Sequence, residues 1–240
     1  MVSEKTIINS FDWVTAESYG ARFYRADLHF HTPASEDART KKEIHNRKRD
    51  TYTWKLYDEV FPGKNNNLEE YYKKVREKQE EIERKSKELA GKMVERFVAE
   101  KIRLVAVTDH NGIGTIWNDP EADKKIMDLA APTWYELIDD KAREVNKKEG
   151  KTLLTILPGV EISTTGVHIL AVFPPQVPRR EIHFIICDLL NDVGFDIKEW
   201  GKNPKLGKAS IYNTIELIAA KGGIPIIAHA DGSDQAILKL

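Results

Sequence analysis

The sequence predicts an α/β fold in which a parallel sheet, or a barrel, is covered by amphipathic helices. Short runs rich in Val, Ile and Leu alternate along the chain with longer stretches of helical periodicity. This alternation is typical of parallel strands joined by crossover helices. Histidines and acidic residues stand at the ends of several of these runs, where α/β folds gather their ligands.

Five apolar runs are too short for buried helices and therefore predict strands. They cover residues 23–28, 103–108, 153–157, 167–173 and 224–228. Four stretches with helical spacing lie between them, at residues 68–101, 133–148, 178–190 and 209–220. The last stretch is followed by Lys221-Gly222-Gly223, a sequence that ends helices.

Residues 38–100 differ from the rest because they are dense in Lys, Glu and Arg, and they predict a charged helical insertion. Its long helix has a seam with three-four spacing, formed by Leu68, Tyr72, Val75, Gln79, Ile82, Ser86, Leu89, Met93 and Phe97. Two interpretations stay open: a helix packed on the barrel wall, or a protruding hairpin that pairs with another chain. The basic stretch 39–49, followed by Tyr52 and Trp54, is either a solvated surface or a nucleic-acid contact.

The composition describes one large domain, residues 1–240, with enough apolar residues for a substantial core. A formal net charge of −1 gives no overall attraction to nucleic acid or membranes. The single cysteine, Cys187, excludes a disulfide framework and favours a cytoplasmic protein with this thiol in the core. The sequence shows neither a signal peptide nor an apolar run of membrane length.

Five of the seven histidines stand in short motifs beside the predicted strands. The motifs are Asp27-Leu28-His29-Phe30-His31, Thr108-Asp109-His110-Asn111, Gly159-Val160-Glu161, Val167-His168 and Ala228-His229. Imidazoles and carboxylates are ligands that suit zinc, manganese and iron. The sequence therefore predicts a multinuclear metal site at the carboxyl ends of the strands. His45 and His183 belong to no motif, and we expect them in surface or core roles.

A hairpin between residues 161 and 168 is expected to bring Glu161 and His168 onto one face of the sheet. If Thr164 and Thr165 form the turn, Glu161 lies directly opposite His168. If Thr165 and Gly166 form it, His168 lies opposite Ser163, which shares a strand face with Glu161. In both registers, Glu161 and His168 lie on the same face of the sheet.

In this order, the five motifs resemble the signature of the PHP superfamily, the polymerase and histidinol phosphatase domain. The resemblance spans about residues 22–231. The sequence His-Thr-Pro-Ala-Ser at residues 31–35, followed by Asp37, is most similar to bacterial proteins that join an N-terminal PHP domain to a large ATPase. The resemblance implies a distorted (βα)7 barrel that binds up to three divalent ions, zinc, manganese or iron, and hydrolyses phosphoesters.

The resemblance also implies a ligand set. It assigns His29, His31 and Glu161 to the first ion, Glu161 as a bridge with His168 and His229 to the second, and Asp37 with His110 to the third. Glu36 is an alternative to Asp37. Catalysis would depend on metal-bound water and on no further catalytic residue. Asp27 and Asp109 precede ligands, so they are expected to orient the imidazoles or to brace a turn.

The sequence departs from the family pattern at its C-terminus. The closing Asp-x-His motif is missing after His229, so the chain is either the N-terminal part of a longer protein, the interpretation that we favour, or a natural truncation. The last barrel strands and a fused ATPase domain are then expected beyond Leu240.

The leading functional prediction is a metal-dependent phosphoesterase that acts on a phosphorylated small molecule, a nucleotide or nucleic acid. The alternative is a non-catalytic metal-binding PHP module that binds a partner or nucleic acid. A metal amidohydrolase is a third hypothesis, but no basic residue in a recognisable metal-bridging position supports it.

Overall fold

The computed structural model describes residues 24–35, 68–116, 132–195 and 206–229, and these ranges contain five strands and four helices. The strands are β1 (Arg25–Phe30), β2 (Ile102–Val107), β3 (Thr155–Ser163), β4 (His168–Val172) and β5 (Ile224–Ile227). The helices are α3 (Leu68–Ala99), α4 (Trp134–Glu149), α5 (Arg179–Val193) and α6 (Ile211–Ala220). The predicted α/β class and each predicted strand and helix are confirmed, although several boundaries differ.

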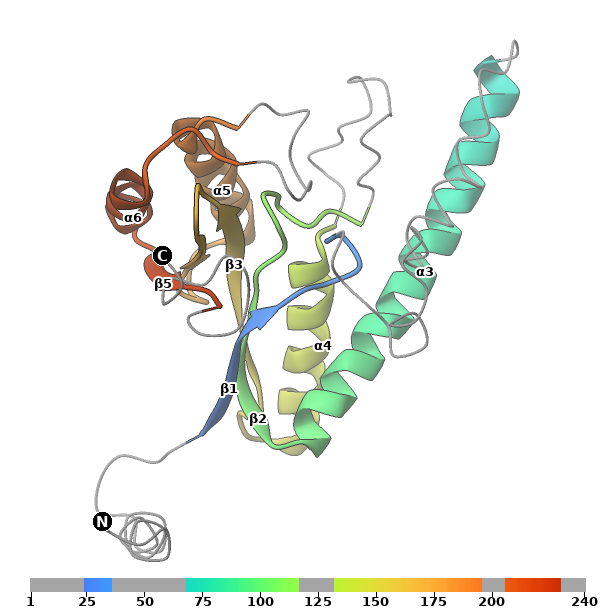
Figure 1. The fold of residues 1–240 in the computed structure, drawn as a ribbon. Coiled ribbons are helices and arrows are strands. Elements are labelled where there is room, and N and C mark those ends of the chain that lie inside the picture. Colours follow the sequence, from blue (N-terminus) through green and yellow to red (C-terminus); the bar gives the residue numbers. More distant parts are fainter. Residues whose placement is uncertain (1–23, 36–67, 117–131, 196–205, 230–240) are drawn as a thin grey trace, which may run out of the picture.

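The strands form one curled sheet, a half-barrel, in the order β1-β2-β3-β4-β5 (Figure 1). β1, β2 and β3 run parallel, whereas β3 with β4 and β4 with β5 are antiparallel pairs. β5 therefore runs in the same direction as β1, β2 and β3. As a result, the carboxyl ends of these four strands and the start of β4 lie at one edge of the sheet.

Two ligand candidates predicted just after strands lie inside them instead. His29 belongs to β1, which continues to Phe30, and Glu161 belongs to β3, which continues to Ser163. The extension of β3 has a clear cause, because its second half gains β4 as an antiparallel partner. The sequence run at 153–157 accounts only for the half of β3 that pairs with β2.

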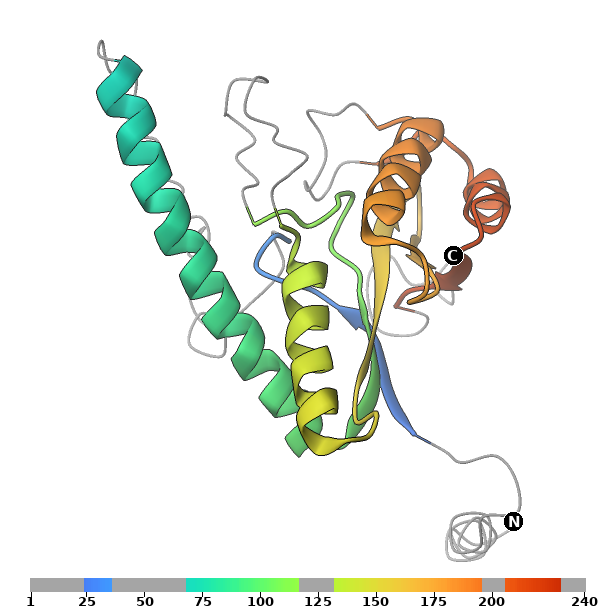
Figure 2. The same ribbon diagram turned by 180° about the vertical axis from the view of Figure 1, so that it is seen from behind.

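The four helices cover the outer face of the half-barrel (Figures 1 and 2). α3 lies beside α4 and contacts β2, α4 contacts β3, and α5 and α6 pack together over β3, β4 and β5. Their apolar side chains and the outward residues of the strands form the main core. On the inner face a smaller cluster consists of Ala106, Leu170, Val172 and Ala228, with Leu28, Leu157 and Ile226 partly buried against it.

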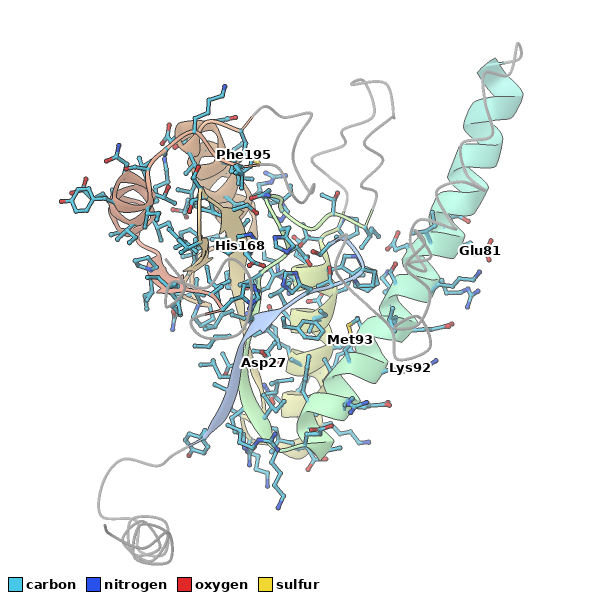
Figure 3. All side chains as sticks on the ribbon, in the orientation of Figure 1. Asp27, Glu81, Lys92, Met93, His168 and Phe195 are labelled. Atoms are coloured by element: carbon cyan, nitrogen blue, oxygen red, sulfur yellow. The ribbon has the colours of Figure 1, made fainter. Side chains whose placement is uncertain are left out.

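The long helix α3 is the crossover connection between β1 and β2. Among its described side chains, Ser86, Ala90, Val94 and Phe97 are buried, which supports packing on the barrel wall. Figure 3 shows Met93 on the side facing α4, while Glu81 and Lys92 lie on the outer side. The exposed side carries ion pairs four residues apart, such as Arg84 with Glu88, each worth only a few tenths of a kcal/mol.

Several predictions fall outside the described residues. These concern Glu36, Asp37, His45, the basic stretch 39–49 with Tyr52 and Trp54, and everything after His229. Cys187 is half-buried on α5, and burial raises the pKa of its thiol to about 11, so it stays a neutral packing residue near pH 7. No helix in the described residues has both the length and the apolar character to cross a membrane.

Gly159 lies in β3 where the strand changes partner from β2 to β4. A Cβ added there would lie 2.8 Å from the carbonyl oxygen of Ala171 and 2.9 Å from Cγ2 of Thr108. We expect Gly159→Ala to lower the free energy of unfolding by about 1–3 kcal/mol, measured by urea denaturation, because the crowded backbone must shift.

The control for this variant is Gly91→Ala in α3, where an added Cβ meets no atom within 4 Å. There the lower backbone entropy of alanine should stabilise the protein by about 0.5–1 kcal/mol. Equal effects of the two substitutions would contradict the close approach of the strands at Gly159.

Candidate metal centre

The carboxylate of Glu161 is fully buried and lies at the carboxyl edge of the sheet. Imidazoles surround it, and each of the other four strands, or the residues just after it, contributes at least one. The five imidazoles are those of His29, His31, His110, His168 and His229. Figure 3 labels His168, the first residue of β4. All five histidines predicted from the motifs are thus brought together with the predicted glutamate.

One oxygen of Glu161 faces the imidazoles from the β1 and β2 side. Its Oε2 lies 2.8 Å from Nε2 of His29, 3.1 Å from Nε2 of His31 and 3.4 Å from Nε2 of His110. The rings of His29 and His31, and those of His31 and His110, have centroids 4.8 Å apart. These three nitrogens therefore approach the same side of the carboxylate.

The other oxygen faces the imidazoles from the β4 and β5 side. Oε1 of Glu161 lies 2.7 Å from Nδ1 of His168 and 3.3 Å from Nε2 of His229. The carboxylate thus stands between two groups of nitrogens, as a ligand that bridges two ions does.

The hairpin register explains how Glu161 and His168 meet. The structure pairs Ser163 with His168, and the N–H of Thr164 donates to the carbonyl of Val167. Of the two registers left open by the sequence, the one with Thr165 and Gly166 at the turn is therefore correct. Because side chains alternate along a strand, Glu161 shares its face with Ser163 and so with His168.

Hydrogen bonding and burial act in opposite directions on Glu161. Burial alone would raise the pKa of this carboxyl, but hydrogen bonds from His168, His29 and His31 outweigh it and hold the pKa far below its usual range. The carboxylate is therefore ionised at any physiological pH. The pKa of His229 is lowered, chiefly by burial, which keeps this imidazole in the neutral form that binds metals.

The donor atoms fit divalent metal ions. Nε2 of His29 and Nε2 of His31 lie 2.9 Å apart, close to the separation of about 3.3 Å between two nitrogens of one tetrahedral zinc site. Nε2 of His168 is buried and has no hydrogen-bond partner among the described residues, although buried polar atoms are normally paired. Because Nδ1 of the same ring faces Glu161, this nitrogen points away from the carboxylate, and an ion shared with Glu161 would be bound through Nδ1.

Two sets of three side chains have ligand atoms within 4.8 Å of one another: His29, His31 and Glu161, and His110, Glu161 and His168. The first set is the one implied by the PHP resemblance. The second brings His110 to Glu161, whereas the resemblance assigns His110 to a separate ion with Asp37, outside the described residues. His229 stands beside the second set, through its contact with Glu161.

The two predicted supporting carboxylates hold the backbone of the ligand-bearing segments. Oδ1 of Asp27 accepts a hydrogen bond from the backbone N–H of His29 at 3.1 Å. Asp109 is buried and accepts from the backbone N–H of Thr32 at 2.6 Å and from its hydroxyl at 2.7 Å. Both contacts support the turn-bracing alternative, because they position the chain around His29 and His31.

Sequence reasoning missed two further residues that hold the ligand-bearing segments. Oγ of Ser35 lies 3.0 Å from Nδ1 of His31. The side chain of Asn111 accepts from the N–H of Ser163 and donates to its hydroxyl, while its own N–H donates to the carbonyl of Glu161. The only available signal was position, since Asn111 directly follows a ligand and Ser35 stands one helical turn beyond another.

Two residues of the site have left-handed backbone conformations that are unusual for side chains of their size. Asn111 has φ of 46° and His229 has φ of 52°. Such conformations cost free energy and persist where the surroundings impose them. Here the bond from the N–H of Asn111 to the carbonyl of Glu161 and the bond from the N–H of Ala228 to the carbonyl of His168 hold the backbone at or beside these two residues.

The chain matches no family model, and no curated protein matches it either. The description of the site therefore depends on its geometry. The fold and the site together define an α/β half-barrel with a buried cluster of histidines and one glutamate that is suited to bind divalent metal ions.

Proposed function

We propose that this chain is a PHP-type, metal-dependent phosphoesterase domain. The observation that carries the proposal is the convergence of five imidazoles on the buried carboxylate of Glu161. Two triplets of ligand atoms around one carboxylate match the needs of a bridged pair of ions. In this proposal the five strands belong to the seven-stranded barrel that the PHP resemblance implies.

Different residues of the chain would hold the two ions. His29 and His31 with Glu161 would hold one ion, and His168 with Glu161 would hold the other, with His110 and His229 as the further imidazoles beside the carboxylate. Divalent ions bound there would supply a water of lowered pKa and positive charge for phosphate oxygens. The protein keeps the carboxylate of Glu161 ionised, lowers the pKa of His229, and holds the ligand-bearing segments together through the backbone bonds around the site.

The charge of the ligand set favours an anionic substrate. Neutral imidazoles cancel none of the charge of the ions, and Glu161 cancels only one unit of it. Even with Asp37 as a further ligand, two divalent cations would leave the site positive. Such a site binds and stabilises phosphoester oxygens more strongly than the neutral oxygen of an amide, which favours phosphoester hydrolysis over amide hydrolysis.

The substrate is proposed to be a phosphorylated small molecule, a nucleotide or nucleic acid. Monoesters and diesters can be separated directly by assays with p-nitrophenyl phosphate, bis-p-nitrophenyl phosphate and a single-stranded oligonucleotide. Binding of the oligonucleotide at several salt concentrations tests nucleic acid separately, because phosphate contacts weaken steeply as salt rises.

The experiment that tests the function combines metal analysis with hydrolysis. Protein expressed with zinc, manganese and iron in the medium should carry at least one ion per chain by elemental analysis, and chelation should remove its hydrolytic activity. Protein that carries no ion under these conditions would overturn the proposal. If the protein binds metal but hydrolyses none of the three substrates, the non-catalytic metal-binding module is the correct function.

A further inference from the structure

The carboxylate of Asp109 is a buried connection between the segments that carry the metal ligands. It is 3% exposed and lies directly before His110. Its two oxygens accept from the N–H and the hydroxyl of Thr32, the residue after His31, across 77 positions of sequence. Its backbone carbonyl accepts from the N–H of Glu161 at 3.0 Å. Asp109 thus contacts or adjoins the three segments that carry His31, His110 and Glu161.

A short turn that begins at Thr32 links Asp109 to the imidazole of His31. The hydroxyl of Thr32, while donating to Asp109, accepts from the N–H of Ala34 at 3.2 Å. The carbonyl of Thr32 accepts from the N–H of Ser35 at 3.0 Å, which closes a turn over residues 32–35. This turn places Oγ of Ser35 3.0 Å from Nδ1 of His31.

The turn also gives Nδ1 of His31 a hydrogen-bond partner outside the cluster. When Nδ1 donates to the hydroxyl of Ser35, Nε2 keeps its lone pair and can bind a metal ion; with no ion present, Nε2 lies 3.1 Å from Oε2 of Glu161 and can donate to it instead. Outer hydrogen bonds of this kind commonly fix the ring of a ligand histidine.

The space around Asp109 is closed on its other side by Gly114. This glycine has φ of 61°, and a Cβ added to it would lie 2.4 Å from Oδ2 of Asp109. Thr32 is fully buried as well. The carboxylate is therefore held in one position by Thr32 on one side and by the backbone of Gly114 on the other.

We propose that the Asp109–Thr32 pair is a positioning device that sets His31 and its turn in the metal-binding arrangement before any ion arrives. The inference depends on the proposed function only in taking His31 as a metal ligand. Preorganisation of this kind raises affinity because the ion does not have to order the turn when it binds. The hydroxyl of Thr32 is the element that can be removed without changing the shape of the side chain.

The test compares Thr32→Val with Thr32→Ser in the intact chain, with zinc alone as the probe. Valine keeps the shape but loses the hydroxyl, so zinc affinity, measured by chelator competition, should fall about 10–100-fold. Serine keeps the hydroxyl and should retain affinity within about threefold of wild type, well short of that loss. In metal-free protein, NMR of the imidazole nitrogens should show a single tautomer of His31 in wild type and a tautomer mixture in Thr32→Val.

Thr214→Val is the matched control. Thr214 is also fully buried, and its hydroxyl donates to the carbonyl of Ser210 in α6 at 2.9 Å. Its loss should lower the thermal midpoint but leave zinc affinity and the tautomer of His31 unchanged.

The outcomes separate this inference from the function on which it depends. Wild-type protein that binds no zinc would overturn both proposals. Wild-type protein that binds zinc, with Thr32→Val equal to wild type in affinity, would overturn only the positioning role. An equal loss of affinity in Thr214→Val would also overturn it, because the effect would then come from general destabilisation.

Discussion

Glu161→Gln is expected to abolish tight metal binding, with affinity for zinc or manganese lowered about 100–10,000-fold. The substitution keeps the size of the side chain but removes the charge on which five imidazoles converge. Removing one partner of a buried charged group typically costs about 3–5 kcal/mol, which corresponds to this range. The amide also presents an NH2 group where a carboxylate oxygen would bridge two ions.

The affinity is measured by competition with a chelator of known strength, and Glu136→Gln serves as the matched control. Glu136 closes the capping box at the start of α4, a role that glutamine also fills, and it lies outside the metal cluster. Glu136→Gln should bind metal like wild type. Wild-type affinity in Glu161→Gln would show that this residue is no ligand.

The metal-free protein provides an independent check on the same residue, because the folded-state pKa of Glu161 is lowered from 4.5. A carboxyl with a lowered pKa stabilises the fold above its unfolded pKa and loses that contribution as pH falls. The unfolding free energy of wild type should therefore decrease as pH falls below about 4.5. Glu161→Gln should show a shallower decrease in urea titrations over the same pH range.

The sequence predicted the ligand cluster well because strand patterns limit where side chains can meet. The motifs around His29, His110 and His229 follow from one rule, that strands running in the same direction end at the same edge. The hairpin placed Glu161 and His168 on one face whichever register formed. These predictions required local periodicity and no long-range detail.

The supporting contacts could not be predicted in the same way. Asp109 and Thr32 are 77 residues apart, and nothing in either motif specifies that they bond to each other. The two hydrogen bonds between Asn111 and Ser163 likewise join residues 52 positions apart that no motif pairs. The β3 boundary was misplaced for a related reason, since pairing with β4 decides it, and Gly159 and Pro158 argue against a strand when taken alone.

His31→Ala is expected to lower phosphoester hydrolysis at least about a thousandfold, to the rate seen after chelation. His31 contributes one nitrogen of the set that includes His29 and Glu161, so its loss leaves that ion with too few protein ligands. Without the ion, the pKa of water returns from about 7 toward 15.7, and little hydroxide is available near neutral pH. Hydrolysis of p-nitrophenyl phosphate and elemental analysis of the same sample measure both effects.

His183→Ala is the control, because its imidazole is 13% exposed, compared with 18% for His31, but lies 3.8 Å from Glu136 and outside the cluster. His183→Ala should keep both its bound metal and its hydrolytic activity.

Since the ring of His31 is partly accessible, added imidazole should enter the space left in His31→Ala and restore part of the metal binding and part of the hydrolytic activity. Full activity in His31→Ala would exclude the first metal set from catalysis, and equal losses in both variants would show that the effect is one of folding.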